Sequence, residues 1–226
     1  SPSCLLGPGG PMTKLIIFDF WGTLIENGVR PSPSKQVRYF LRLRMPFSEF
    51  ITRFEEAFMT KKFDSLREGF EEVTKAFDKR VPEFVYDKMV GMWNKFSILS
   101  KPFDDTIEAL EDLKKDYKLA LLSNTDNFSL QQVMDKYDLE KYFDHVFLSC
   151  ETGILKGDPE SYRQVLEELD VKPEDALMVG DSPQSDLVSA EKAGVPAVLI
   201  DRRGWSEDYP AVGSLKELRE YIEKEQ

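Results

Sequence analysis

The clearest pattern in the chain is a series of short, nearly continuous apolar runs separated by longer mixed segments. The five runs are LIIF (15–18), LALL (119–122), HVFL (145–148), ALMV (176–179) and AVLI (197–200). Continuous apolar runs are typical of strands that are buried on both faces of a parallel sheet. Segments of helical length separate or flank the last four runs, at about 104–116, 127–137, 159–170, 184–193 and 214–225. Strands that alternate with helices predict an α/β fold with a Rossmann-like, doubly wound parallel sheet.

The interval between the first two runs is too long for a single crossover helix. Ten of the 16 phenylalanines of the chain lie in residues 31–99. Apolar residues recur there at helical spacing in three stripes: Phe47, Phe50, Ile51, Phe54 and Phe58; Leu66, Phe70, Val73 and Phe77; Phe84, Val85, Met89, Met92, Trp93 and Phe96. Such stripes predict helices that pack on one another, in preference to a cofactor-binding box. We therefore expect an α/β core domain of residues 12–28 and 100–226, with an inserted α-helical cap domain of residues 29–99.

Composition and charge narrow the classes of partner. The 226 residues include 30 Lys and Arg against 41 Asp and Glu, which gives a net charge of −11. A non-specific nucleic-acid binder needs a basic face, so no nucleic-acid partner is expected. Anionic small molecules stay possible, because a local pocket can oppose the overall sign. No apolar run reaches the ~18 residues of a membrane span, so no membrane partner is expected either.

The two cysteines, Cys4 and Cys150, are not at metal-ligand spacing. Sparse cysteine predicts a reducing, cytoplasmic setting. Cys4 belongs to residues 1–11, SPSCLLGPGGP, which precede Met12 and which we expect to be an artificial leader outside the fold. We expect Cys150, which follows the third strand, to be a small buried residue rather than a nucleophile.

Polar residues follow four of the predicted strands. They are Asp19, Trp21, Gly22 and Thr23 after the first strand, Ser123 and Asn124 after the second, Lys156 after the third, and Asp181, Ser182 and Asp186 after the fourth. Ligands of open α/β sheets bind outside the carboxyl ends of the strands, so these side chains are expected to converge. Carboxylates are hard oxygen ligands that suit Mg²⁺, and a lysine beside them can neutralise a phosphate oxygen. An aspartate nucleophile would form an acyl phosphate and divide one difficult step into two.

The same residues form an ordered set of motifs. These are FDFWGTL (18–24), SN (123–124), K-x-D-P-x-x-Y (156–162) and GD-x4-D-x3-A-x-x-A-G (180–194). Each motif is weak alone, but the set in this order at strand ends resembles the haloacid dehalogenase superfamily. The resemblance spans residues 15–200 and places the insert where this superfamily carries a helical cap. It implies a Rossmann-like core, an aspartate nucleophile and, for most members, Mg²⁺-dependent phosphoryl transfer to and from a small phosphorylated substrate.

The resemblance also implies roles for individual residues in catalysis and phosphate binding. Asp19 matches the nucleophile of the superfamily. Thr23 matches the hydroxyl of the first loop, and Ser123 and Asn124 match the pair that binds the phosphate. Lys156 matches the lysine that holds the nucleophile and the phosphate together.

A metal site is implied in the same way. Asp19 and Asp181 match direct ligands of Mg²⁺, and Trp21 matches the position whose backbone carbonyl binds the metal. Asp186 matches an acid of this site that either binds the metal or supports those that do. Three carboxylates in one place repel each other unless a cation binds among them.

Trp21 departs from the pattern of typical phosphatases, which carry a second aspartate there. That aspartate protonates the leaving group, and general acid–base catalysis contributes roughly 10²–10⁴-fold. The 2-haloacid dehalogenases carry an aromatic residue at this position and need no metal, but they replace the first acid of the GD motif with serine. Because Asp181 and Asp186 are both present, we expect a Mg²⁺-dependent, phosphatase-like hydrolase. The alternatives are a metal-independent dehalogenase and a weakly active or non-catalytic member that binds a phosphorylated ligand.

The sequence leaves the replacement for the missing acid open. Candidates are Tyr39, Glu26, an ordered water and the substrate itself. His145, the one histidine, is expected on the surface because it opens the third strand, away from the predicted site. The segment RRGW (202–205) is expected to be a solvated loop, although its arginines follow the fifth strand and could approach the site. The pattern gives no indication of oligomeric state.

Overall fold

The computed structural model describes residues 12–225, and the expected leader of residues 1–11 lies outside this range. Its centre is a six-stranded, all-parallel sheet in the order β5-β4-β1-β6-β7-β8. The strands are β1 (Leu15–Phe18), β4 (Lys118–Ser123), β5 (His145–Leu148), β6 (Ala176–Gly180), β7 (Ala197–Ile200) and β8 (Ala211–Val212). The five predicted strands and the α/β class are confirmed. The two-residue β8 was missed, because so short a strand has no recognisable pattern.

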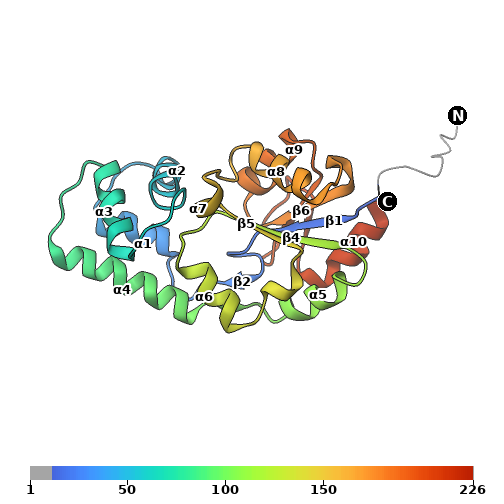
Figure 1. Cartoon of the computed structure of the whole chain (residues 1–226), viewed down its shortest axis with the longest axis horizontal. Helices are drawn as coiled ribbons and strands as arrows, with labels where there is room; N and C mark the ends of the chain where they lie inside the picture. Colours follow the sequence, from blue (N-terminus) through green and yellow to red (C-terminus); the bar gives the residue numbers. More distant parts are fainter. Residues whose placement is uncertain (1–11, 226) are drawn as a thin grey trace, which may run out of the picture.

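Helices cover both faces of this sheet (Figure 1). One face carries α5 (Thr106–Leu113), α6 (Ser129–Lys136) and α10 (Leu218–Glu225), and the other carries α8 (Glu160–Leu169) and α9 (Ser189–Lys192). Alternate side chains of β1 point to opposite faces of the sheet. Ile16 and Phe18 pack toward α5, α6 and α10, while Leu15 and Ile17 pack toward α8 and α9. All four are fully buried, which explains why the run is continuously apolar.

Four further helices form a separate layer beyond the carboxyl ends of the strands (Figure 1). They are α1 (Pro33–Phe40), α2 (Phe47–Phe58), α3 (Leu66–Ala76) and α4 (Glu83–Leu99), called here the α1–α4 unit. Their apolar faces enclose a hydrophobic core in which Phe54, Phe58 and Phe70 surround Trp93 with ring centroids 5.1–5.9 Å from its own. The predicted packing of the stripes is confirmed, except at Phe84. This residue lies about one helical position off the face of Val85 and Met89 and is exposed.

The chain enters and leaves the α1–α4 unit through a two-stranded antiparallel ribbon. The ribbon pairs β2 (Ile25–Glu26) with β3 (Lys101–Pro102). Beside it, the backbone N–H of Gly28 donates to Ser100 Oγ at 3.0 Å. A Cβ on Gly28 would lie 2.6 Å from the backbone of Leu99, so only glycine allows the two passages to run this close. The ribbon thus holds the α1–α4 unit over the end of the sheet.

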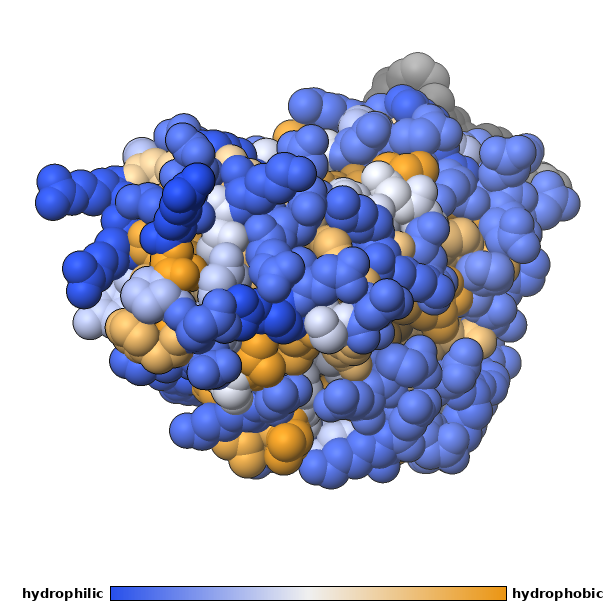
Figure 2. Space-filling model, turned by 60° about the vertical axis from the view of Figure 1, so that its left-hand side comes forward, coloured by the Kyte–Doolittle hydropathy of each residue, from blue (hydrophilic) through white to orange (hydrophobic). Residues whose placement is uncertain are grey.

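Short helical turns complete the chain. They are α7 (Ser149–Thr152), the 3-10 turns η1 (Glu140–Tyr142), η2 (Pro173–Asp175) and η4 (Leu215–Glu217), and the π-helical turn η3 (Pro183–Val188). The single helix expected at about 184–193 is therefore η3 followed by α9. Within residues 12–225, no helix has the length and apolar character needed to cross a bilayer. The face in Figure 2 is largely hydrophilic, with apolar side chains in small groups.

Candidate active site

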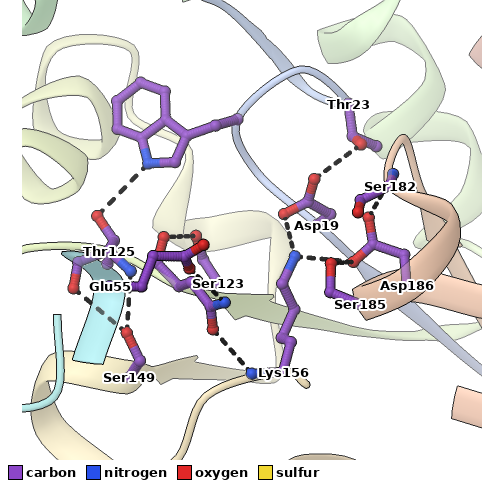
Figure 3. Close-up of polar contacts among 12 residues, drawn as sticks. Asp19, Thr23, Glu55, Ser123, Thr125, Ser149, Lys156, Ser182, Ser185 and Asp186 are labelled. Atoms are coloured by element: carbon purple, nitrogen blue, oxygen red, sulfur yellow. Dashed lines mark hydrogen bonds and ion pairs between the residues drawn. The ribbon is translucent and has the colours of Figure 1, made fainter. Parts of the chain in front are cut away.

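The carboxyl ends of β1, β4 and β6 bring the predicted site residues together below the α1–α4 unit. Asp19 directly follows β1, Ser123 ends β4, and Asp181 directly follows β6. Lys156 reaches the same place from the loop that follows α7 (Figure 3). The parallel arrangement puts these strand ends at one edge of the sheet, so residues more than 100 positions apart meet there.

Lys156 lies between two carboxylates. Its Nζ is 2.6 Å from Asp19 Oδ1 and 2.8 Å from Asp186 Oδ1, and all three side chains are buried (Figure 3). Burial alone would lower the pKa of Lys156, but the charges of Asp186 and Asp19 outweigh it and raise this pKa well above the ordinary value. The lysine is therefore a permanent cation that holds the Asp19 carboxylate in one orientation.

The backbone of Lys156 is fixed by two side chains. Its N–H donates to Asn124 Oδ1 at 2.8 Å, and its carbonyl accepts from Ser189 Oγ at 2.6 Å. Asn124 therefore orients the lysine loop rather than presenting its carbonyl oxygen to a ligand. Its Nδ2 donates to Glu55 Oε2 at 2.7 Å, a contact that crosses from the sheet to α2.

Asp186 is fully buried within η3, the π-helical turn that follows β6. Its Oδ2 accepts from the backbone N–H of Ser182 at 2.9 Å, while Oδ1 faces Lys156 (Figure 3). Burial raises the pKa of Asp186, and the charge of Lys156 opposes this rise. A Cβ on Gly180 would lie 2.3 Å from Asp186 Cγ, so the glycine of the GD motif makes room for this carboxylate.

Three carboxylates offer oxygens for a cation. One oxygen each of Asp19, Asp181 and Asp186 lie within 4.8 Å of one another. Desolvation of its carboxyl group by surrounding protein, and next the charge of Asp19, raise the pKa of Asp181 well above its ordinary value, although the residue as a whole is exposed. With Lys156 as the one paired cation, the cluster holds more negative than positive charge. Its all-oxygen donor set and its charge fit a divalent cation such as Mg²⁺.

The remaining loop residues tie the site to its surroundings. Thr23 Oγ1 donates to Asp19 Oδ2 at 3.1 Å. Ser123 Oγ lies 3.4 Å from the carbonyl of Asn124. The N–H of Thr125 donates to Ser149 Oγ at 2.9 Å, which joins the ends of β4 and β5 (Figure 3). Thr23 and Ser123 are thus both at the strand ends where the sequence predicts them.

Trp21 packs between the sheet and the α1–α4 unit. Its ring centroid is 4.9 Å from that of Phe20 and 4.5 Å from that of Phe96 on α4. Its Nε1 donates to Thr125 Oγ1 at 3.4 Å. The side chain contributes to the hydrophobic cores on both sides, and it has no acidic proton to transfer. The following Gly22 has φ +84°, and a Cβ there would lie 2.1 Å from Asp181 Oδ2.

Comparison with known proteins agrees with this geometry. The family model described as haloacid dehalogenase-like hydrolase matches residues 13–194. This chain belongs to the haloacid dehalogenase-like hydrolases. The resemblance found in the motifs is thereby confirmed.

Relatives of this hydrolase include named phosphatases. It is 26% identical over 201 residues to glyceraldehyde 3-phosphate phosphatase of Methanothermobacter thermautotrophicus, over 84% of this chain and 86% of the relative. It is 39% identical over 113 residues to phosphoserine phosphatase of Thermus thermophilus, over 48% of this chain and 45% of the relative. A 2-haloacid dehalogenase from Pseudomonas syringae pv. Tomato DC3000 has the same fold, with a TM-score of 0.64 and 20% identity over 95% of this chain and 100% of that one.

Glu55 of α2 is a site residue of the hydrolase that sequence reasoning missed. It is partly buried and reaches from the α1–α4 unit to Asn124 (Figure 3). Burial raises its pKa, against the hydrogen bond from Asn124 and the charge of Lys156. One signal was present in the sequence: Glu55 lies four residues after Ile51 in the apolar stripe of α2, so it shares the face that packs inward.

Of the two side chains considered as substitute acids, only Glu26 lines a hollow that reaches this cluster. Tyr39 is 79% exposed and lines a surface hollow together with Phe84 on α4, so it is not at the site. Glu26 lies on β2 with one oxygen 3.8 Å from Arg30, and it lines a hollow of about 600 Å³ that also borders Asp181. Neither contacts Asp19 in the described part of the chain.

Three expectations outside the motifs are resolved. His145 is exposed, 4.0 Å from Glu168, which confirms a surface residue. Cys150 is buried, and burial raises the pKa of its thiol to about 11, which confirms an unreactive residue. The expectation of a solvated loop is wrong for Arg202. Its guanidinium forms a two-pronged ion pair with Asp105 at 3.1 and 3.2 Å and donates to the carbonyl of Thr23 at 3.1 Å.

Proposed function

We propose that this hydrolase is a Mg²⁺-dependent phosphatase that cleaves small phosphate monoesters through an aspartyl-phosphate at Asp19. The observation that carries the proposal is the cluster of Asp19, Asp181 and Asp186 around the buried cation of Lys156. The two relatives described above are both phosphatases, which supports the same reaction class.

The reaction proceeds in two steps. A carboxylate oxygen of Asp19 attacks phosphorus, the bond from phosphorus to the ester oxygen breaks, and the leaving oxygen takes the electron pair and then a proton. Water then attacks phosphorus, the bond to Asp19 breaks, and inorganic phosphate leaves with the carboxylate restored. Lys156 holds the nucleophile in place and balances charge on the phosphoryl oxygens. Thr23 donates to the other oxygen of Asp19, and Ser123 serves as the hydroxyl donor to the phosphoryl group.

Asp19 and Asp181 would hold the metal, together with the backbone carbonyl of Trp21. A bound Mg²⁺ supplies positive charge that stabilises the phosphoryl group in the transition state. In our proposal Asp186 acts mainly through Lys156, because both of its oxygens already accept hydrogen bonds from Lys156 and Ser182. Residues 29–99 serve as the cap that shields the site from bulk water.

Trp21 shapes the choice of leaving group. Without an aspartate at this position, the proton for the leaving oxygen comes from water or from the substrate. Substrates whose leaving groups need no proton, such as aryl phosphates, therefore lose least from the substitution.

A metal-independent 2-haloacid dehalogenase is the second candidate, favoured by the aromatic side chain at Trp21. Its chemistry would use Asp19 as nucleophile and would need neither Asp181 nor a metal. A weakly active member that only binds a phosphorylated ligand is the third.

The test is hydrolysis of p-nitrophenyl phosphate with Mg²⁺ and with a chelator, beside halide release from 2-chloropropionate. We expect phosphate release with Mg²⁺ only, lost in Asp19→Asn and Asp181→Asn. Asp87→Asn, an exposed aspartate of α4, is the matched control and should retain activity. Halide release without metal would favour the dehalogenase. Turnover in neither assay, with ligand affinity intact in Asp19→Asn, would favour the binding protein.

A further inference from the structure

A small cavity of about 180 Å³, partly open to solvent, lies between the α1–α4 unit and the end of the sheet. Trp21 and Asn124 belong to its lining, so it adjoins the site around Asp19. Its other walls include Ile51, Trp93 and Phe96 from the α1–α4 unit. Ligand pockets for larger molecules are ~300–1,000 Å³, so this cavity suits a small organic group rather than a nucleotide.

The formal charges that line the cavity are of one sign. Of the residues in the described chain that line it, only Glu55 and Asp126 carry a formal charge, and both are acidic. Lys156 is not among the residues that line the cavity, and its ammonium group lies between Asp19 and Asp186. An anionic group that entered this space would meet two carboxylates and no cation among the described lining residues, and charge repulsion near a protein surface is stronger than in bulk water.

The two acidic side chains differ in how many of their oxygens already accept hydrogen bonds. Asp126 is saturated: Oδ1 accepts from Trp93 Nε1 at 3.1 Å, and Oδ2 accepts from the N–H groups of Phe128 and Ser129, each at 2.9 Å. It therefore positions Trp93 as a wall of the cavity. Glu55 takes part in the hydrogen bonds of the described residues through Oε2 alone, with Asn124 as donor. Its second oxygen is available to a ligand.

We propose that this cavity holds the leaving group of the substrate and that Glu55 selects leaving groups that donate hydrogen bonds, either hydroxyl or ammonium, and rejects carboxylates. This inference rests on the proposed phosphatase function and names the substrate class of the same site. A donor on the substrate pairs with the second oxygen of Glu55, whereas a carboxylate in this cavity is repelled by the negative charges of Glu55 and Asp126. A site built around a hydrogen bond discriminates strongly, because the wrong ligand leaves its polar group unpaired.

A different route exists for an anionic leaving group. The charged residues that line the hollow of about 600 Å³ are four basic ones, Arg30, Lys35, Arg202 and Arg203, and three acidic ones, Glu26, Asp181 and Asp201. A substrate with a carboxylate would be drawn to that side, and the substrate preference of the enzyme therefore distinguishes the two directions.

The experiment compares three phosphate monoesters of matched size in the full chain with Mg²⁺ in excess. These are 2-aminoethyl phosphate, 2-hydroxyethyl phosphate and carboxymethyl phosphate, which differ only in the group at the end of the leaving alcohol. Phosphate release gives kcat/KM for each. We expect the amino and hydroxy esters to exceed the carboxy ester by at least about tenfold. The order of kcat/KM among the three esters is measured on the wild-type protein, so it tests the inference even if a variant fails to fold.

The variant arm uses Glu55→Gln, which keeps the shape and removes the negative charge. The ratio of kcat/KM for the amino ester over the carboxy ester should fall by about tenfold or more. Glu56→Gln, its exposed neighbour on α2, is the control and should leave the ratio unchanged. A merely structural role of Glu55 would lower all three rates together and keep the ratio.

The outcomes separate this inference from the function on which it rests. If the carboxy ester is the best of the three, or if Glu55→Gln leaves the ratio as it was, the inference is overturned while the phosphatase function stands. If none of the three esters and no aryl phosphate is hydrolysed, the proposed function fails and the inference fails with it.

Discussion

Replacement of Lys156 by methionine tests the charge balance at the centre of the site. The lysine ammonium is the counter-charge to Asp19 Oδ1 at 2.6 Å and to Asp186 Oδ1 at 2.8 Å, and all three side chains are at most 6% exposed. Methionine fills the volume of the stem but leaves two buried carboxylates facing each other. Removal of one partner from a buried ion pair costs about 3–5 kcal/mol. For a chain of this size, each kcal/mol lowers Tm by about 2–4 °C, so we expect Lys156→Met to lower it by about 6–20 °C.

The assay is thermal unfolding followed by far-ultraviolet circular dichroism, at neutral pH with a chelator present. Lys224→Met is the matched control, because Lys224 Nζ forms an ion pair of 2.9 Å with Glu220 on the surface of α10. Solvent screens that pair, so its loss should barely change Tm. Mg²⁺ should restore part of the lost stability of Lys156→Met, since a divalent cation can replace the missing charge.

The pH dependence gives a second check. Burial already raises the pKa of Asp186, and loss of Lys156 removes the charge that opposes this rise. A carboxyl group with a raised pKa in the folded state destabilises the fold at pH values above that pKa. The difference in Tm between variant and wild type should therefore be largest at neutral pH and shrink as pH falls through the raised pKa of Asp186. Equal Tm changes in Lys156→Met and Lys224→Met, or a difference that does not respond to pH, would refute the reasoning.

Two further substitutions test single positions. Trp21→Asp restores a carboxyl group where typical phosphatases of this family carry one. It should raise kcat/KM on an alkyl phosphate by up to about 10²-fold, with little change on p-nitrophenyl phosphate. An unchanged rate on the alkyl phosphate would show that the proton comes from elsewhere. Gly180→Ala should cost about 1–3 kcal/mol in denaturant unfolding, because the new Cβ would lie 2.3 Å from Asp186 Cγ. Gly91→Ala in α4, where a Cβ meets nothing within 4 Å, should instead gain about 0.5–1 kcal/mol. Similar effects of the two alanines would contradict the role of Gly180.

The sheet could be predicted from sequence because burial on both faces leaves a local signature. Each central strand lies between two helical layers, as the opposite contacts of Ile16 and Ile17 show, so every position in the run is apolar. The two-residue strands β2, β3 and β8 have no such signature, since their pairing depends on chain segments that arrive from elsewhere. The π-helical turn η3 was missed for a similar reason: Asp186 accepts from the N–H of Ser182 and from Lys156, a tertiary partner.

The motif residues of the site could also be predicted from the sequence. Asp19, Ser123 and Asp181 lie at the carboxyl ends of parallel strands, and the topology of the sheet brings such ends to one edge. The motif also predicted that Lys156 lies beside them, although a loop position in the sequence does not give the distance between Lys156 and Asp19. The sequence by itself thus determined the α/β class, the family and most of the polar groups around Asp19.

The tertiary structure decided what faces that cluster from the other side. Glu55 and Asn124 are 69 positions apart, and Arg202 and Thr23 are 179 apart, yet both pairs are in hydrogen-bond contact. Helical periodicity indicates which face of α2 turns inward, but not which groups of the core it meets. The angle at which the α1–α4 unit packs on the sheet determines those contacts, and that angle depends on the joint packing of Trp21, Phe96 and the β2–β3 ribbon. Local sequence patterns carry no information about such an angle, because it is a property of surfaces formed only after both parts have folded.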